Sequence, residues 1–207
     1  YLSVACNLYF YESLLAMAEL YDYHAVQMNE SGAAEQAQYY RQLAALSKQK
    51  INEMFWNSQT GRFIMSIDVN GRRFDMGATY INTMASAFGI ADPDKGQSIY
   101  DWLDGKRIVE SDLSSTGGST GEDIYYYKIA PRTNTVDIYN LSEGGSGTAY
   151  WWTHDGLITT DPGAWAGWGN NQMNGGYFLW NSAYDIQGRA SYLGADNAFE
   201  RFNVIME

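Results

Sequence analysis

Cysteine is nearly absent from this sequence: Cys6 is the one cysteine in 207 residues. A single cysteine excludes an intramolecular disulfide and a zinc site built from thiolates. The compartment therefore cannot be inferred from cysteine usage. Long apolar runs are also missing, since no stretch approaches the roughly 20 residues that a membrane-spanning helix needs. We therefore predict no membrane partner.

Basic residues are few: 13 Lys and Arg stand against 24 Asp and Glu, which gives a formal net charge of −11. Phosphate backbones are bound by clustered Lys and Arg, so we predict no nucleic-acid partner. The sequence has no Gly-rich phosphate loop, no HExxH and no G-x-S-x-G motif. Asp68-Val69-Asn70-Gly71 lacks the further ligands of a calcium loop. No cofactor and no metal are predicted.

Apolar residues, in contrast, are plentiful at 45% of the chain, enough for the core of one domain. Their helical spacing predicts six helices, over residues 8–28, 33–56, 78–89, 93–103, 177–193 and from 196 onward. Short loops between successive helices predict three antiparallel hairpins. Tyr1 and Glu207 both fall inside packed patterns, so we expect a piece of a longer chain. The predicted fold class is mainly α.

Between the second and third helices the apolar period changes. Phe63, Met65 and Ile67 alternate with polar residues, which is typical of a strand. Asn70-Gly71 follows, and this pair favours a two-residue turn in which both residues have positive φ. We predict a small β-hairpin that projects from the helical body.

Residues 106–171 are rich in Gly, Ser, Thr and aromatic residues. The chain has 17 Tyr and 7 Trp, and a disordered linker would not carry so many large rings. A long ordered loop in a compact domain is usually functional. Aromatic rings offer flat faces on which sugars stack, although they also fill gaps between helices. The candidate sugar-binding rings are Tyr125, Trp151, Trp152, Trp165 and Trp168 in this part, and Trp180 beyond it.

Four stretches, in order along the chain, resemble the six-hairpin (α/α)6 glycosidases, a group that includes rhamnosidase-like and glucosidase-like families. They are Phe55–Phe63 with the pattern FW-x-x-x-TGRF, Asn82–Ala91, Asn174–Tyr177 with an NGG-aromatic turn, and Tyr192–Ala198. The resemblance implies a toroid of helical hairpins and a carbohydrate substrate. A full toroid has twelve helices, so the six predicted here correspond to its C-terminal half.

This resemblance also bears on the partners and the compartment. The rest of the barrel, from the same parent chain, is an expected partner of this half. Asn174 is expected at the active-site end of an inner helix and is a substrate-binding candidate. A periplasmic or secreted location is favoured, although no residue fixes it.

Glycoside hydrolysis needs two carboxyl groups, one on each side of the scissile bond. Four acids lie close together in the sequence on Gly-rich backbone, beside three tyrosines. Crowded acids raise one another's pKa, which keeps one carboxyl protonated near neutral pH. The predicted catalytic candidates are Asp112, Glu122 and Asp123. Solvated loop charges or helix caps are the alternative interpretation.

Polar residues near the tryptophans are candidates for holding the sugar. His154 and Asp155 lie between Trp152 and Trp165, where they would bind a sugar hydroxyl, although an Asp-Gly turn also explains them. Arg132 would bind the carboxylate of a uronic acid, or would pair with the neighbouring acids.

Three functions stay open at this point. The first is a glycoside hydrolase with two carboxylates in an aromatic-lined pocket. The second is a non-catalytic carbohydrate-binding module of the same fold, which would have aromatic rings but no working carboxyl pair. The third is a polysaccharide lyase, which would need a Tyr or His base beside a cation.

Overall fold

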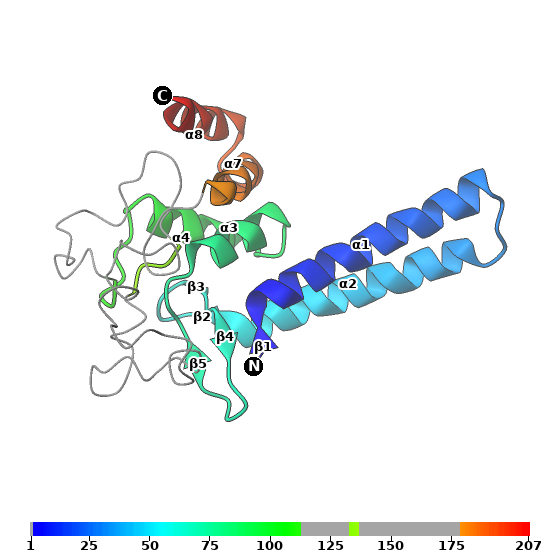
Figure 1. Cartoon of the computed structure of the whole chain (residues 1–207), viewed down its shortest axis with the longest axis horizontal. Coiled ribbons are helices and arrows are strands. Elements are labelled where there is room, and N and C mark those ends of the chain that lie inside the picture. The colour runs from blue at the N-terminus through cyan, green and yellow to red at the C-terminus, as the bar shows by residue number, and fades with distance from the viewer. Residues whose placement is uncertain (1, 113–132, 137–178) are drawn as a thin grey trace, which may run out of the picture.

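The computed structural model of the chain describes residues 2–112, 133–136 and 179–207, shown in colour in Figure 1. The described residues form six helices and five two-residue strands. The helices are α1 (Val4–Gln27), α2 (Ala33–Phe55), α3 (Thr79–Ala87), α4 (Pro93–Leu103), α7 (Trp180–Tyr192) and α8 (Ala195–Met206). The mainly helical class predicted from the sequence is confirmed, and each of the six predicted helices is present.

Helices α1 and α2 form a long antiparallel hairpin that projects from one side of the molecule (Figure 1). Small side chains line the contact between the two helices, among them Ala18, Ala37 and Ala44, all buried. Toward the tip, the rings of Tyr21 and Tyr40 stack with their centroids 5.5 Å apart. The other helices gather at the base of this hairpin.

The strands form two small antiparallel sheets at that base. In one, β2 (Trp56–Asn57) pairs with β3 (Arg62–Phe63). In the other, β4 (Ser66–Ile67) lies between β1 (Leu2–Ser3) and β5 (Arg73–Phe74). The predicted projecting hairpin is therefore confirmed as β4 and β5.

The turn of this hairpin differs from the prediction. Gly71 has a φ of 81°, but Asn70 does not adopt positive φ, so the predicted two-residue turn was wrong. The Asp68 amide donates to the Arg72 carbonyl at 2.9 Å, which leaves a three-residue loop with glycine in its left-handed position. The Asp68 carboxylate accepts the amides of Asn70 and Arg72, both at 2.8 Å. These side-chain bonds favour the observed turn.

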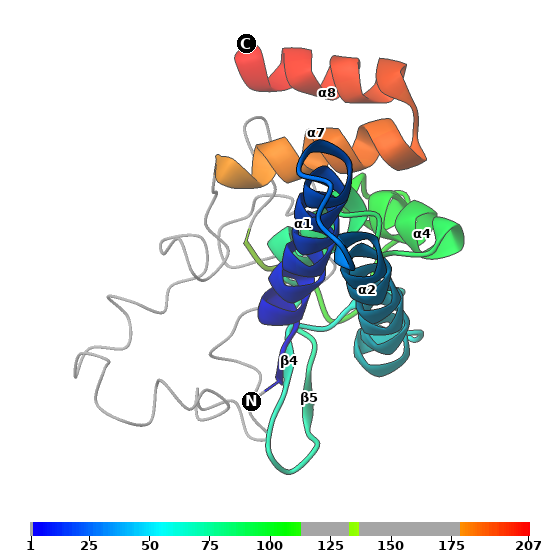
Figure 2. The same cartoon turned by 90° about the vertical axis from the view of Figure 1, so that its right-hand side faces the viewer.

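Helix α3 is the centre of the body. Every residue from Ile81 to Ala87 is buried, and α3 packs against α7. Helix α7 in turn lies beside α8 (Figure 2). The two helices run parallel, because Tyr80 meets Trp180 at their N-terminal ends, while Gln187 donates to the Ala87 carbonyl toward their C-terminal ends. Asn82 in α3 exchanges two hydrogen bonds with the backbone of Phe63, which joins the helix to β3.

Buried ion pairs connect the last two helices to the body. Arg189 pairs with Asp185 at 2.8 Å and with Asp104 at 2.6 Å, and Arg201 pairs with Asp185 at 2.9 Å. In the part of the chain that the structure describes, α4 is the next helix after α3, and α8 is the next helix after α7. This order matches the predicted helical hairpins. Among the described residues the helices do not close into a ring, so the toroid stays a prediction.

Candidate functional site

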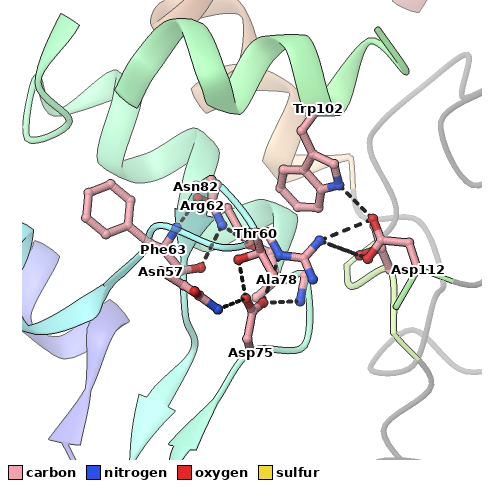
Figure 3. A network of polar contacts seen from close by, with 12 residues as sticks. Asn57, Thr60, Arg62, Phe63, Asp75, Ala78, Asn82, Trp102 and Asp112 are labelled. Atoms are coloured by element: carbon pink, nitrogen blue, oxygen red, sulfur yellow. Dashed lines mark hydrogen bonds and ion pairs between the residues drawn. The ribbon is translucent and has the colours of Figure 1, made fainter. Parts of the chain in front are cut away.

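A buried arginine forms the centre of a polar network (Figure 3). Arg62 follows the β2–β3 turn, and its side chain is completely buried. Its guanidinium lies over the Trp102 ring, 4.6 Å from the ring centroid, which is a cation–π arrangement. Burial lowers the pKa of Arg62, but the charges of Asp75 and Asp112 outweigh it and raise that pKa. The arginine therefore stays charged.

Asp75 is the first of its two acidic partners. Arg62 Nε donates to Asp75 Oδ1 at 2.8 Å. The other oxygen, Oδ2, accepts the Asn57 amide at 2.9 Å and the Thr60 hydroxyl at 2.5 Å. The backbone amide of Gly77 donates to Oδ1 at 3.1 Å. Asp75 thus connects the β2–β3 turn to the segment that leads into α3.

Asp112 is the second partner and one of the predicted catalytic acids. It is fully buried, and Arg62 Nη1 donates to its two oxygens at 2.8 and 3.2 Å. The Trp102 indole donates to Oδ2 at 2.8 Å, and the Thr135 hydroxyl donates to Oδ1 at 2.7 Å. Both carboxylate oxygens are therefore occupied by donors from the protein. This arrangement suits a structural anchor better than a group that reaches a substrate.

A row of aromatic rings lies at the interface of α1, α3 and α7. The ring centroids of Tyr80 and Trp180 are 5.9 Å apart, and those of Trp180 and Tyr184 are 5.7 Å apart. The row continues from Tyr184 to Phe88 at 5.5 Å and from Phe88 to Tyr9 at 6.1 Å. Trp180 is 44% exposed and Tyr9 is 51% exposed. We call these five residues the aromatic row.

The aromatic row begins beside the polar network. Tyr80 belongs to the first turn of α3, and the amide of its neighbour Thr79 donates to the Thr133 carbonyl at 3.0 Å. Thr133 is two residues from Thr135, which binds Asp112. The N-terminal end of α3 therefore lies next to the point where residues 112 and 135 meet.

Two hydroxyl groups of this row have raised pKa values. Burial raises the pKa of Tyr80 to about 12. The hydrogen bond to Tyr9, followed by burial, raises the pKa of Tyr184 to about 12. The hydroxyls of Tyr80 and Tyr184 therefore act as hydrogen-bond donors and acceptors at neutral pH, and their raised pKa values oppose their use as bases.

Two further polar side chains accompany the aromatic row. Burial, and then the charge of Glu19, raise the pKa of Glu12, whose carboxylate also acts on Tyr184. Asn181 follows Trp180 in the first turn of α7 and is fully buried. Neither its Oδ1 nor its Nδ2 has a hydrogen-bond partner in the structure as described. A buried amide of this kind is rare and calls for a ligand or a water molecule.

Most residues singled out in the sequence lie outside the described residues. These are Glu122, Asp123, Tyr125, Arg132, Trp151, Trp152, His154, Asp155, Trp165, Trp168 and Asn174. Their roles stay predictions. Asp112 and Trp180 are the exceptions: the structure places Asp112 in the buried network around Arg62, and Trp180 in the aromatic row.

The groups that sequence reasoning missed are the partners of Asp112 and most of the aromatic row. A buried ion pair at Arg62 could have been expected, because a charged residue next to Phe63 in a short strand is buried only when it is paired. No sequence pattern indicated that Tyr9, Tyr80 and Tyr184 meet, since they come from three helices that are far apart in the sequence.

Two further features, a metal-ion cluster and a membrane-spanning helix, are absent from the described residues. No group of three or more His, Cys, Asp or Glu side chains within them is placed to hold a metal ion. No helix among them combines the length and the apolar character needed to cross a membrane.

Comparison with protein families and with curated proteins identifies no relative of this chain. No protein-family model matches the sequence, and no curated protein matches it. The resemblance to six-hairpin glycosidases therefore stays a prediction that rests on the four quoted stretches.

Proposed function

We propose that this protein is a glycoside hydrolase that binds an oligosaccharide or polysaccharide along the aromatic row. The aromatic row is the observation that carries the proposal. Sugar rings stack on aromatic faces, and partly exposed Tyr and Trp side chains add hydroxyl and indole groups that bind sugar hydroxyls. The five rings of the aromatic row are uncharged, which suits a neutral ligand.

The arrangement around Asp112 supports this assignment. The Asp112 and Thr135 side chains are hydrogen-bonded, so the described residues on the two sides of positions 113–132 lie together beside the N-terminal end of α3. Glu122 and Asp123 fall within those positions. We assign them the acid and base roles of hydrolysis, and we assign Asp112 to positioning, because its oxygens are occupied by Arg62, Trp102 and Thr135.

A non-catalytic carbohydrate-binding module is the second candidate. One observation favours it: Asp112, the one predicted catalytic acid in the described residues, is engaged in a buried ion pair. The lyase is less well supported in the described part, because the raised pKa values of Tyr80 and Tyr184 oppose their use as bases.

Product release from a panel of plant and bacterial oligosaccharides tests the proposal. We expect Glu122→Gln and Asp123→Asn to lower product release by about 100-fold or more while binding persists. Trp180→Ala should weaken binding at least about tenfold through the lost ring. The matched control is Phe202→Ala, which removes an exposed ring of α8 outside the aromatic row.

Each result decides between the candidates. Binding that needs Trp180 without any product from the native chain would favour the binding module. Equal effects of Trp180→Ala and Phe202→Ala would contradict the aromatic row as the sugar site.

A further inference from the structure

One face of α1 is covered at its start and bare beyond it. Near the N-terminal end of the helix, Tyr9 contacts Phe88 and Tyr184, which follow or belong to the helices of the body. Helix α1 has 24 residues and α3 has nine, which correspond to roughly 36 and 14 Å. The body therefore covers only the first part of this face, and the rest of the α1–α2 hairpin extends past it (Figure 1).

The bare part of that face has the pattern of a helix–helix contact. Its residues follow Tyr9 at alternating spacings of three and four, which places them on one side of the helix. We call them the outer stripe: Ser13, Ala16, Leu20 and Tyr23, all exposed. They lie opposite the buried side of α1, which faces α2.

The composition of the outer stripe is unusual for a surface. A helix face that meets water normally carries charged residues, and a helix that is apolar all round is normally covered on all sides. The outer stripe has no charged residue, and Leu20 and Tyr23 are 49% and 59% exposed. Ser13 and Ala16 are small, which lets the backbone of another helix approach closely.

Charge decides what kind of helix fits. Helix α1 has no Lys and no Arg, and Glu12 and Glu19 lie about two turns apart along the edge of the outer stripe. Burial, and then the charge of Glu19, raise the pKa of Glu12. A second copy of this chain would bring another Glu12 and Glu19 to the same contact, and each chain carries a net charge of −11. A helix with basic residues relieves this repulsion instead.

We propose that the outer stripe of α1 docks a single amphipathic helix of about three turns, with Lys or Arg beside its apolar stripe. The contact continues the interface that α3 and α7 already make at Tyr9. It is independent of the proposed carbohydrate activity, because it uses residues beyond the aromatic row.

The probes are two synthetic helical peptides with the same Leu/Ala stripe, one flanked by Lys and the other by Glu. Each carries a fluorophore, and anisotropy measures its affinity for the whole chain. We expect the Lys peptide to bind at least about tenfold more tightly than the Glu peptide. Ala16→Arg should weaken binding of the Lys peptide by about tenfold or more.

Ala45→Arg is the matched control. It makes the same substitution at an exposed position of α2 and adds the same charge, so affinity should change less than about twofold. Arg and Ala both favour helices, so neither variant should unfold the hairpin. Circular dichroism at the same concentration checks that both keep the helical content of the native chain.

Four outcomes overturn the proposal. The first is the absence of binding by the Lys peptide, and the second is equal binding by the two peptides. The third is an equal effect of Ala16→Arg and Ala45→Arg. The fourth is a native chain that sediments as a dimer and becomes a monomer on Ala16→Arg, because a second copy would then be the occupant.

Discussion

The Thr135 hydroxyl donates to the Asp112 carboxylate at 2.7 Å, in the same buried place where both side chains contact Arg62. Asp112 and Thr135 are 23 positions apart in the sequence, and both bind the same guanidinium group. The strand pair β2–β3 supplies Arg62, and α4 supplies Trp102. The network therefore connects the hairpin base, the helical core and the start of the stretch that carries Glu122 and Asp123.

Asp112→Asn should destabilise the fold strongly. The change removes the charge that compensates buried Arg62, and breaking a buried pair in this way costs about 3–5 kcal/mol. Urea denaturation of the native and variant chains measures the difference. Asp22→Asn is the control, because its partner Arg41 is exposed and the loss of such a pair should change stability little. Equal stability of Asp112→Asn and the native chain would contradict the role of Asp112 as an anchor.

Gly77→Ala should disturb the same network through steric conflict. Gly77 has a φ of 59°, and a Cβ there would lie 1.7 Å from Thr135 Oγ1 and 2.9 Å from Arg62 Nη1. Gly71 also has positive φ, but a Cβ there meets nothing within 4 Å. Gly71→Ala should therefore cost about 1–2 kcal/mol from backbone strain, and Gly77→Ala should cost clearly more. Similar losses in thermal denaturation of the two variants would show that the contact yields without cost.

Asn181→Leu should separate binding from stability. Neither polar atom of Asn181 has a partner within the described structure, so an apolar side chain of similar size should leave stability unchanged or raise it. Asn82→Leu is the contrast, because Asn82 bonds the backbone of Phe63 and Ala78, and its loss should cost about 1–3 kcal/mol or more. If Asn181 contacts the sugar, Asn181→Leu should also weaken oligosaccharide binding.

Calorimetric titration with the best oligosaccharide of the panel measures that effect. A variant that is stable and binds normally would remove Asn181 from the candidate site. A variant that unfolds as readily as Asn82→Leu would show that the amide has a structural partner after all.

Glu12→Gln should change how stability depends on pH. The folded-state pKa of Glu12 lies above its ordinary value of 4.5, through burial and then the charge of Glu19. Glu12 therefore favours folding below about pH 4.5, and this contribution is lost as the pH rises through the folded-state pKa. Relative to Glu12→Gln, the native chain should lose a few tenths of a kcal/mol between pH 4.5 and 7, since solvent screens this half-exposed group.

Urea denaturation at pH 4 and pH 7 measures this difference. Glu19→Gln should reproduce part of the effect, because it removes one cause of the raised pKa of Glu12. A native chain that gains stability over Glu12→Gln as the pH rises would reverse the sign and contradict the account.

The helices were predictable because their apolar periods are strong. Tyr11, Leu15 and Ala18 recur at helical spacing in α1, and Asp92-Pro93 marks the start of α4. The hairpin of β4 and β5 was predictable from Asn70-Gly71, but its turn type was not, because the Asp68 side chain selects a different turn.

The candidate site was less predictable, because it depends on tertiary contacts. Asp112 was selected as a catalytic acid from its crowded sequence neighbourhood. Its surroundings are set by Arg62 and Trp102, and neither residue was used to select Asp112 from the sequence. The aromatic row joins Tyr9 to Tyr184, a pairing that no local pattern reveals.

Proton NMR of the purified chain with the oligosaccharide panel tests the central claim most directly. We predict a new anomeric signal that grows over hours, and its configuration will show whether hydrolysis retains or inverts the anomeric centre. The same signal should be absent with Glu122→Gln and with Asp123→Asn. Broadening of substrate lines by the native chain, with no new anomeric signal for any sugar, would contradict the hydrolase and leave a carbohydrate-binding protein.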